Sequence, residues 1–300
     1  MKSIENIHEI TKAMEMIAGF RFKRAENRFS KSKFYFGEME RMVLNLCSSV
    51  MDAKTQRAAR LPPACRQAGN GQASPRNVFQ LFDKRKIQKK TLVVMTGDKG
   101  LCGAYNANLL KMAASWLKEN NRFETGLVAV GKVAVNFFKK RHMKLMSDTP
   151  EKSMVDLELA KKITTELKTL FLSGKTDSVE LLYTPFRAGG TGQNVFKPFL
   201  SLNTLMDSVK PDAELYDYIY EPGFEAVFIS LLEKYLEGKM YVCLLESLTS
   251  EYNARRVAMK QATENGEEVL DNLRLLRNKT RQATITRELS EIVSGASVLV

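Results

Sequence analysis

A group of glycines in the middle of the chain offers the first residues that could bind a nucleotide. The stretch TLVVMTGDKGLCGAYNANL has an apolar run, then Gly97, Gly100 and Gly103, then a helical pattern. A dinucleotide fingerprint needs the closer spacing G-x-G-x-x-G, and a phosphate-binding P-loop needs a lysine followed by serine or threonine after its last glycine. Here Lys99 precedes Gly100, and Asp98 would place negative charge beside a phosphate. The spacing therefore disfavours a nucleotide site.

Other side chains that could carry out chemistry are few. The chain has two histidines, His8 in a helical stretch and His142 in a basic stretch, and no Ser-His-Asp or Cys-His arrangement can be assembled around them. The 4 cysteines lie far apart without a CxxC pair, which is typical of free thiols rather than of a zinc site. We therefore expect no catalytic residue, no metal site and no cofactor.

The overall composition is that of a folded and basic chain. Hydrophobic residues make up 44% of it, and the net charge is +12. Such a charge favours nucleic acid, an anionic membrane surface or an acidic protein as partner. No stretch approaches the roughly 20 apolar residues that a membrane span needs, and the first residues do not look like a targeting signal. We expect an intracellular chain without a targeting or transmembrane segment.

The distribution of proline predicts two long helices, one at each end of the chain. All 8 prolines lie between Pro62 and Pro222. A C-terminal helix of roughly 75 residues would be about 110 Å long, too long for an ordinary globular domain to cover. Its apolar stripe therefore has to pack against another long helix. We expect an antiparallel coiled coil of the two ends, with part of the longer C-terminal helix projecting unpaired.

The apolar residues of both helices recur every three or four positions, as in a coiled-coil seam. The predicted seam consists of Ile7, Ile10, Ile17, Val269, Leu273 and Leu276. Between Arg277 and Thr286 the pattern becomes polar. That break fits either a solvated helix face or a surface that contacts changing partners.

The middle of the chain alternates between strand and helix patterns, which predicts an open α/β sheet with helices on its faces. Strands are expected at 91–96, 126–131, 178–184 and 215–222, and helices at 104–117, 133–141 and 154–171. Residues 57–77 are rich in Pro, Gly, Gln and Ala and read as a linker or insertion.

Three separate stretches share a pattern with one known family. They are ITKAMEMIAGFRFKRAE at 10–26, TGDKGLCGAYNANL at 96–109, and ARRVAMKQATENG followed by NKTRQATITRELSEIVSGA between 254 and 296. In this order they resemble the gamma subunit of the F-type rotary ATP synthase. The resemblance implies an antiparallel coiled coil of the two termini beside a Rossmann-like α/β domain. It also implies that the glycine loop is structural, and that family members carry further residues ahead of the segment that begins this chain.

Pattern and resemblance together divide the chain into four parts. We expect an N-terminal coiled-coil helix at 1–60, a linker or insertion at 61–90, a Rossmann-like α/β domain at 91–221 and a C-terminal coiled-coil helix at 222–300.

The function implied by the resemblance is mechanical. The chain would be the central-stalk rotor shaft, one copy inside three alpha and three beta subunits, and would join the epsilon subunit and the membrane c-ring. Proton-driven rotation would cycle the beta subunits, which carry the catalysis, through different conformations. The chain itself would be no enzyme, would bind no nucleic acid, and would meet the cytoplasmic face of the bacterial inner membrane only through the complex.

The resemblance also implies roles for individual residues. Contacts to the alpha/beta ring fall on Lys12, Met14, Arg255, Arg281, Gln282 and Thr286. The tip of the shaft falls on Ile292, Gly295, Ala296 and Leu299.

Two other hypotheses remain open from the residues themselves. One is a nucleotide-dependent α/β enzyme with helical arms, which binding of ATP or NAD would support. The other is a basic coiled-coil protein that binds nucleic acid, which would show steeply salt-dependent binding.

Overall fold

The computed structural model describes residues 2–56, 87–149, 155–187, 192–200, 221 and 223–297. The elements are α1 (Lys2–Gln56), β1 (Lys89–Met95), α3 (Tyr105–Glu119), β2 (Glu124–Val130), α4 (Lys132–Lys140), β3 (Ser147–Thr149), α5 (Leu157–Leu172), β4 (Ser178–Tyr183), β5 (Val195–Leu200) and α7 (Phe224–Ser297). The expected strand at 215–222 and the linker at 57–77 fall in parts of the chain outside, or almost wholly outside, these residues.

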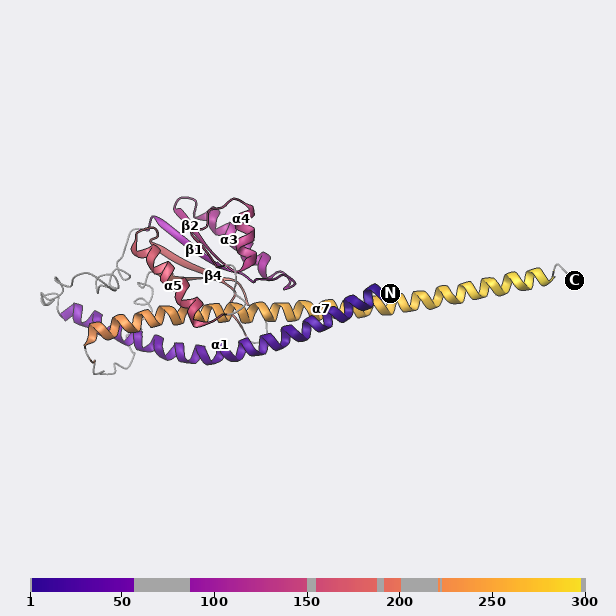
Figure 1. Cartoon of the computed structure of the whole chain (residues 1–300), viewed down its shortest axis with the longest axis horizontal. Helices are drawn as coiled ribbons and strands as arrows, with labels where there is room; N and C mark the ends of the chain where they lie inside the picture. Colours follow the sequence, from indigo (N-terminus) through magenta and orange to yellow (C-terminus); the bar gives the residue numbers. More distant parts are fainter. Residues whose placement is uncertain are drawn as a thin grey trace.

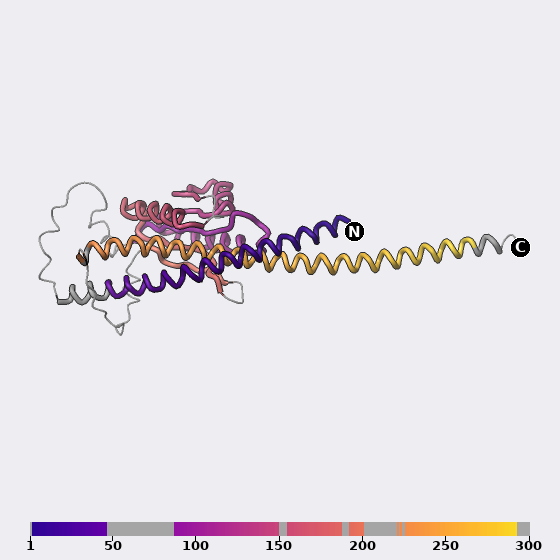
Figure 2. Tube along the Cα trace, turned by 60° about the horizontal axis from the view of Figure 1, so that its bottom comes forward, coloured from indigo at the N-terminus to yellow at the C-terminus, as the bar shows by residue number. Residues whose placement is uncertain are grey.

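The two terminal helices run antiparallel to each other, as expected (Figures 1 and 2). Gly266 of α7 faces His8 of α1, and at the other end of the pair Gly238 faces Met39. Along the chain the partner positions therefore advance in opposite directions. Both views show α7 continuing well past the N-terminal end of α1, so its last part projects alone.

The seam of α1 differs from the predicted one. Ala18, Ala25 and Phe29 are 2–4% exposed and lie in the seam. Three isoleucines expected there lie on a neighbouring face instead: Ile7, Ile10 and Ile17 are 55%, 54% and 53% exposed. The prediction followed the largest apolar side chains, whereas small side chains in the seam let two helices approach closely.

The α7 side of the seam needs a similar correction. Leu270 is 5% exposed and is the buried side chain, while Val269 and Leu276 are 45% and 59% exposed. Leu273 is partly buried. The sequence did not show which apolar residues of α7 face α1, because apolar residues lie on more than one face of this helix. A helix of that kind has no single apolar stripe that marks the seam.

Among the described residues, five strands in the order β3-β2-β1-β4-β5 form the sheet at the core of the α/β domain. The first four strands are parallel and β5 pairs antiparallel with β4 at the edge. The pattern predicted β1, β2 and β4 to within a few residues but missed β3 and β5. Strand β3 has 3 residues, too short for a periodic pattern. Pro198 within β5 is tolerated because this strand lies at the edge of the sheet.

Successive residues of β1 face opposite sides of the sheet. Leu92 and Val94 pack with α3 and α4 on one face. Val93 and Met95 pack with α5 and α7 on the other. The coiled coil therefore serves as one covering layer of the sheet, and the domain could not bury this face without it.

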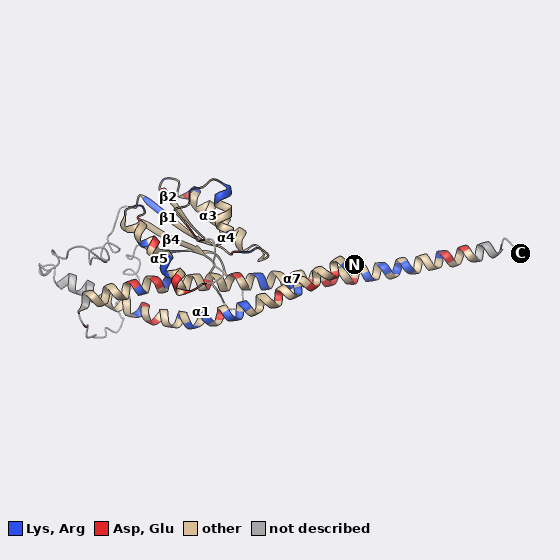
Figure 3. Ribbon diagram, viewed as in Figure 1, with Lys and Arg blue, Asp and Glu red and all other residues tan. Residues whose placement is uncertain are grey.

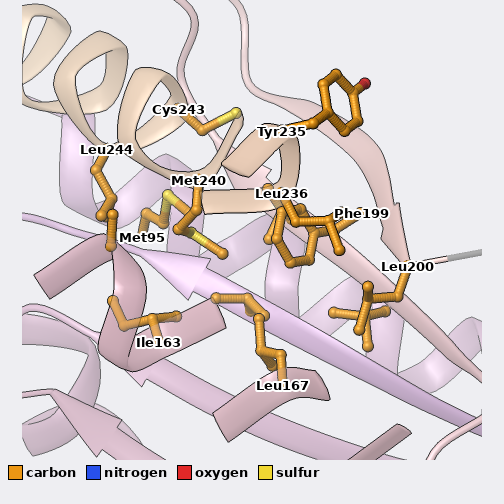
Figure 4. Packing of buried hydrophobic residues seen from close by; sticks show 14 of the residues in the cluster. Met95, Ile163, Leu167, Phe199, Leu200, Tyr235, Leu236, Met240, Cys243 and Leu244 are labelled. Atoms are coloured by element: carbon orange, nitrogen blue, oxygen red, sulfur yellow. The ribbon is translucent and has the colours of Figure 1, made fainter. Parts of the chain in front are cut away.

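The contact between α7 and the sheet is a hydrophobic core (Figure 4). Leu236, Met240 and Leu244 of α7 are fully buried among side chains of the sheet and of α5, including Met95 and Ile163. Burial of this kind stabilises by about 25 cal/mol for each Å² of apolar surface removed from water. The α/β domain and the first half of α7 therefore form one unit.

Candidate functional site: the glycine loop and the projecting helix

The glycine loop between β1 and α3 uses its polar groups within the domain. The N–H of Gly97 donates to Asn106 Oδ1 at 2.9 Å, and its carbonyl accepts from the N–H of Val133 at 3.2 Å. The carboxylate of Asp98 accepts from the N–H of Lys132 at 3.2 Å. These bonds give the loop a structural role, and Asp98 lies at the start of α4, where a carboxylate is favourable.

Gly97 lies directly against a buried carboxylate of α7. A Cβ on this residue would lie 2.6 Å from Cδ of Glu251, closer than real contacts allow. Glu251 itself is only 4% exposed. The first glycine of the loop therefore provides room for a charged side chain of the shaft rather than for a phosphate.

Arg255 balances the charge of Glu251 and joins the shaft to the loop. Its guanidinium donates to Glu251 Oε1 at 2.9 Å, to the carbonyl of Lys99 at 3.0 Å and to the carbonyl of Gly100 at 3.2 Å. The two side chains are 15% and 5% exposed. The resemblance assigned Arg255 to the alpha/beta ring, and that contact stays a prediction; in the structure its guanidinium bonds to groups of the same chain.

Sequence reasoning missed Glu251, although one signal pointed to it. Glu251 and Arg255 are four residues apart, with the acid on the N-terminal side, which is the favourable order for an ion pair on one helix face. What the spacing alone could not show is that this pair lies under the glycine loop.

Two more polar groups at this junction, Tyr105 and Cys102, have raised pKa values. The hydroxyl of Tyr105 lies 2.9 Å from both the carbonyl and the hydroxyl of Ser247. Burial, and to a smaller extent the charge of Glu251, raises the pKa of Tyr105. Burial likewise raises the pKa of the Cys102 thiol. Neither group is prepared for acid–base or nucleophilic chemistry at neutral pH.

In the described part of the chain, neither histidine lies beside a group that could take part in acid–base or nucleophilic chemistry with it. His8 lies against Gly266 in the coiled coil, and His142 is exposed at the end of α4. Within the described ranges, no three His, Cys, Asp or Glu side chains are grouped so as to hold a metal ion. In the same ranges no helix has the length and hydrophobicity to cross a membrane.

The remaining residues assigned to the alpha/beta ring are all exposed. Lys12 and Met14 lie on α1, with Met14 38% exposed. Arg281, Gln282 and Thr286 lie on the projecting part of α7, where the hydroxyl of Thr286 donates to the carbonyl of Gln282 at 2.9 Å.

The expected tip is described only in part. Ile292 is 67% exposed. Gly295 and Ala296 lie in the last turn of α7, and Leu299 lies outside the described residues.

The projecting part of α7 exposes large apolar side chains to water, which is unfavourable. Residues between Arg274 and Ile292 with large exposed apolar surfaces are Leu275 (68%), Leu276 (59%), Ile285 (48%), Leu289 (57%) and Ile292 (67%). A helix of this kind gains most of its stability from packing against something else. This segment is therefore suited to packing against a partner.

The same segment is basic (Figure 3). Arg274 pairs with Asp271 at 3.0 Å and Arg287 with Glu291 at 3.8 Å. Across the described residues, the three basic side chains between these pairs make no ion pair; they are Arg277, Lys279 and Arg281. A partner that packs against this segment would fit it best with acidic groups beside apolar ones.

Comparison with known proteins identifies the family. The sequence profile of the family described as ATP synthase matches residues 1–299. The ATP synthase gamma chain of Moorella thermoacetica is 34% identical over 305 residues, covering 100% of this chain and 96% of its own length. That of Paracidovorax citrulli is 32% identical over 304 residues, with the same two shares.

A solved structure shows the same fold. A chain from the central stalk and c-ring of the Tetrahymena thermophila mitochondrial ATP synthase superposes with a TM-score of 0.57 at 22% identity, covering 85% of this chain and 99% of the other. The profile match and the two relatives extend over essentially the whole length of the chain. The chain belongs to the ATP synthase gamma chain family.

Proposed function

We propose that this chain is the central-stalk rotor shaft of an F-type proton-translocating ATP synthase, which couples rotation of a membrane c-ring to ATP synthesis and hydrolysis. Family membership and the fold support the rotor role. The observation that carries the proposal is the helix that projects past its coiled-coil partner with exposed apolar and unpaired basic side chains (Figure 1). Such a helix is suited to the inside of a protein ring.

The mechanism rests on contacts that change with the angle of the shaft. A rotating helix can alter a catalytic site only by as much as its contacts differ from one position to the next. The exposed face of α7 is uneven, because leucines and isoleucines alternate with basic residues. Each subunit of the surrounding ring would therefore meet a different surface at each rotational position.

Torque must also pass from the α/β domain to the shaft. The hydrophobic core along α7 and the polar contacts of Arg255 with the glycine loop join the two parts. We assign Arg255 and Glu251 to this joint, and Arg255 also stays a candidate for the contacts with the ring. Lys12, Met14, Arg281, Gln282 and Thr286 remain our candidates for ring contacts, with Ile292, Gly295, Ala296 and Leu299 at the tip.

The proposed partners follow the family. One copy of the chain would associate with three alpha and three beta subunits, with the epsilon subunit and with the c-ring. Catalysis would belong to the beta subunits, so the chain itself would be a non-catalytic subunit. Its location would be the cytoplasmic face of the bacterial inner membrane, held there through the complex. The division into a helix at 1–60, a linker at 61–90, an α/β domain at 91–221 and a helix at 222–300 stays a proposal.

Purification of the tagged chain from its native membranes tests this function. The expected result is one copy of the chain with three alpha and three beta subunits, measured by quantitative mass spectrometry. Recovery of nucleic acid or of an unrelated enzyme, without ATP synthase subunits, would overturn the proposal. ATP or NAD binding by the purified chain would instead support a nucleotide-dependent enzyme.

A further inference from the structure

The α/β domain contacts the other helix of the shaft, α1, through the loop that follows β4. Phe186 of this loop lies between two rings of α1, with its centroid 5.6 Å from that of Phe22 and 6.1 Å from that of Phe29. Phe22 and Phe29 are about two helical turns apart, so they lie on one face of α1. The ring of Phe186 is therefore a knob inserted between successive turns of this helix.

The packing around Phe186 has a defined geometry. Its ring meets the ring of Phe29 edge to face, at 87°, and is tilted by 59° against the ring of Phe22. Aromatic pairs prefer tilted and edge-to-face arrangements. Arg256 of α7 also contacts Phe22, with its guanidinium carbon 5.1 Å from the ring centroid. Phe22 of α1 is therefore held by the domain and by α7 together.

A second loop of the domain bonds to α1. Arg28 donates from Nη2 to the carbonyl of Val155 at 2.8 Å and to the hydroxyl of Tyr241 in α7 at 3.3 Å. Val155 directly precedes the N-cap of α5 and is 1% exposed, so its carbonyl belongs to a buried part of the domain. One side chain of α1 consequently bonds to the domain and to α7.

These contacts matter because the seam between the helices is made of small side chains at this level. Ala18 and Ala25 are 2% and 4% exposed in it. Alanine provides a small knob with few atoms in contact, so such a seam gives little resistance when one helix is pushed along the other. The sheet packs on α7, and α1 lies farther from it (Figure 1). The helix that needs further fixing is therefore α1.

We propose that Phe186 and Arg28 are positioning residues that fix α1 along the axis of the shaft, so that α1 and α7 turn as one body under load. An axial shift of α1 would have to carry the ring of Phe22 or Phe29 past that of Phe186 and break the bond of Arg28 to Val155. The inference rests on the proposed function, because it assigns these residues a role within a rotating shaft.

Rotation against increasing viscous load tests this role. The chain is assembled with alpha and beta subunits fixed to a surface, and beads of increasing size are attached through Lys118→Cys, with Cys47 and Cys65 replaced by serine. Phe186→Ala should lower the torque on the largest beads about twofold, because coupling passes through packed side chains that this variant removes. ATP hydrolysis without a bead should stay at the parental rate.

Three control variants separate fixing of α1 from general stability. Phe186→Tyr keeps the ring and should keep the parental torque. Phe34→Ala removes a ring of α1 that is 76% exposed, and it should leave the torque unchanged. Leu109→Ala removes a fully buried side chain on the other face of the sheet, so it should lower the free energy of unfolding but not the torque.

The outcomes distinguish this inference from the proposed function. Parental torque in Phe186→Ala under the heaviest load, or an equal loss of torque in Leu109→Ala, would overturn the positioning role. A parent complex that hydrolyses ATP without turning any bead would count against the rotor function instead.

Discussion

The two ends of α7 belong to one continuous helix but have opposite surroundings. Between Phe228 and Leu248 most of its apolar side chains are buried against the sheet, α5 and α1. Between Arg274 and Ile292 its leucines and isoleucines lie mostly in water. The first part therefore holds the helix in the domain, and the second presents a surface whose stability depends on partners. The same residue type should consequently give different results in the two parts.

The largest difference is expected for leucine. Leu244→Ala removes a fully buried side chain and should lower the free energy of unfolding of the isolated chain by about 3 kcal/mol. Leu275→Ala, at a residue that is 68% exposed, should change it by less than about 0.5 kcal/mol. Urea unfolding followed by circular dichroism measures both. Equal effects would show that the two parts do not differ in packing.

The joint between domain and shaft should be the next most sensitive place. Arg255→Ala leaves Glu251 buried without its counter-charge and should cost roughly 2–3 kcal/mol, less than for a pair sealed completely from water. Adding Glu251→Gln removes that charge and should recover much of the loss. A double variant as unstable as the sum of its single variants would show that the two side chains do not act as a pair.

The corrected seam can be checked with neighbouring residues. Leu270→Ala should lower the stability of the coiled coil by about 2 kcal/mol, because Leu270 is buried near the end of the pairing. Val269→Ala is the matched control and should have little effect. Hydrogen exchange of the first turns of α1 should therefore accelerate only in the Leu270 variant. Faster exchange in the Val269 variant would favour the seam first predicted.

Substitutions in the projecting part of α7 should have the smallest effect on the stability of the isolated chain. Their effect should appear in the activity of the assembled complex. Gln282→Ala should leave the free energy of unfolding within about 0.5 kcal/mol of the parent, since its side chain is exposed. In the assembled enzyme it should reduce ATP-driven proton pumping more than ATP hydrolysis. Unchanged pumping in membrane vesicles would remove Gln282 from the proposed contacts.

The two long helices and three of the strands could be predicted because each has a simple sequence pattern. The absence of proline before Pro62 and after Pro222 predicted both long helices, and apolar runs predicted three strands. The seam was harder, since the small side chains of Ala18 and Ala25 are buried in it, and a search for large apolar residues does not find them. Strand β5 was missed because its antiparallel position depends on β4, which the local sequence does not contain.

Some residues of the candidate site could likewise be predicted from local motifs, and others could not. Arg281, Gln282 and Thr286 were assigned to the ring through the resemblance; the structure shows that they are exposed, and their role stays a prediction. The assignment of Arg255 to the ring stays a prediction, and the motif did not show that its guanidinium bonds to Glu251 and to the glycine loop, because a motif gives residue types without their direction. The partnership of Gly97 with Glu251 joins residues far apart in sequence, so only the folded chain could show it.

Rotation of the α/β domain against a fixed ring tests the rotor function most directly. Cys47 and Cys65 are replaced with serine, and Lys118→Cys in α3 supplies an exposed site for attaching a bead. The chain is assembled with alpha and beta subunits fixed to a surface, and the bead is observed while ATP is added. The proposed function predicts sustained rotation in one direction that stops when ATP is removed. A complex that hydrolyses ATP while the bead on the incorporated chain stays still would contradict it.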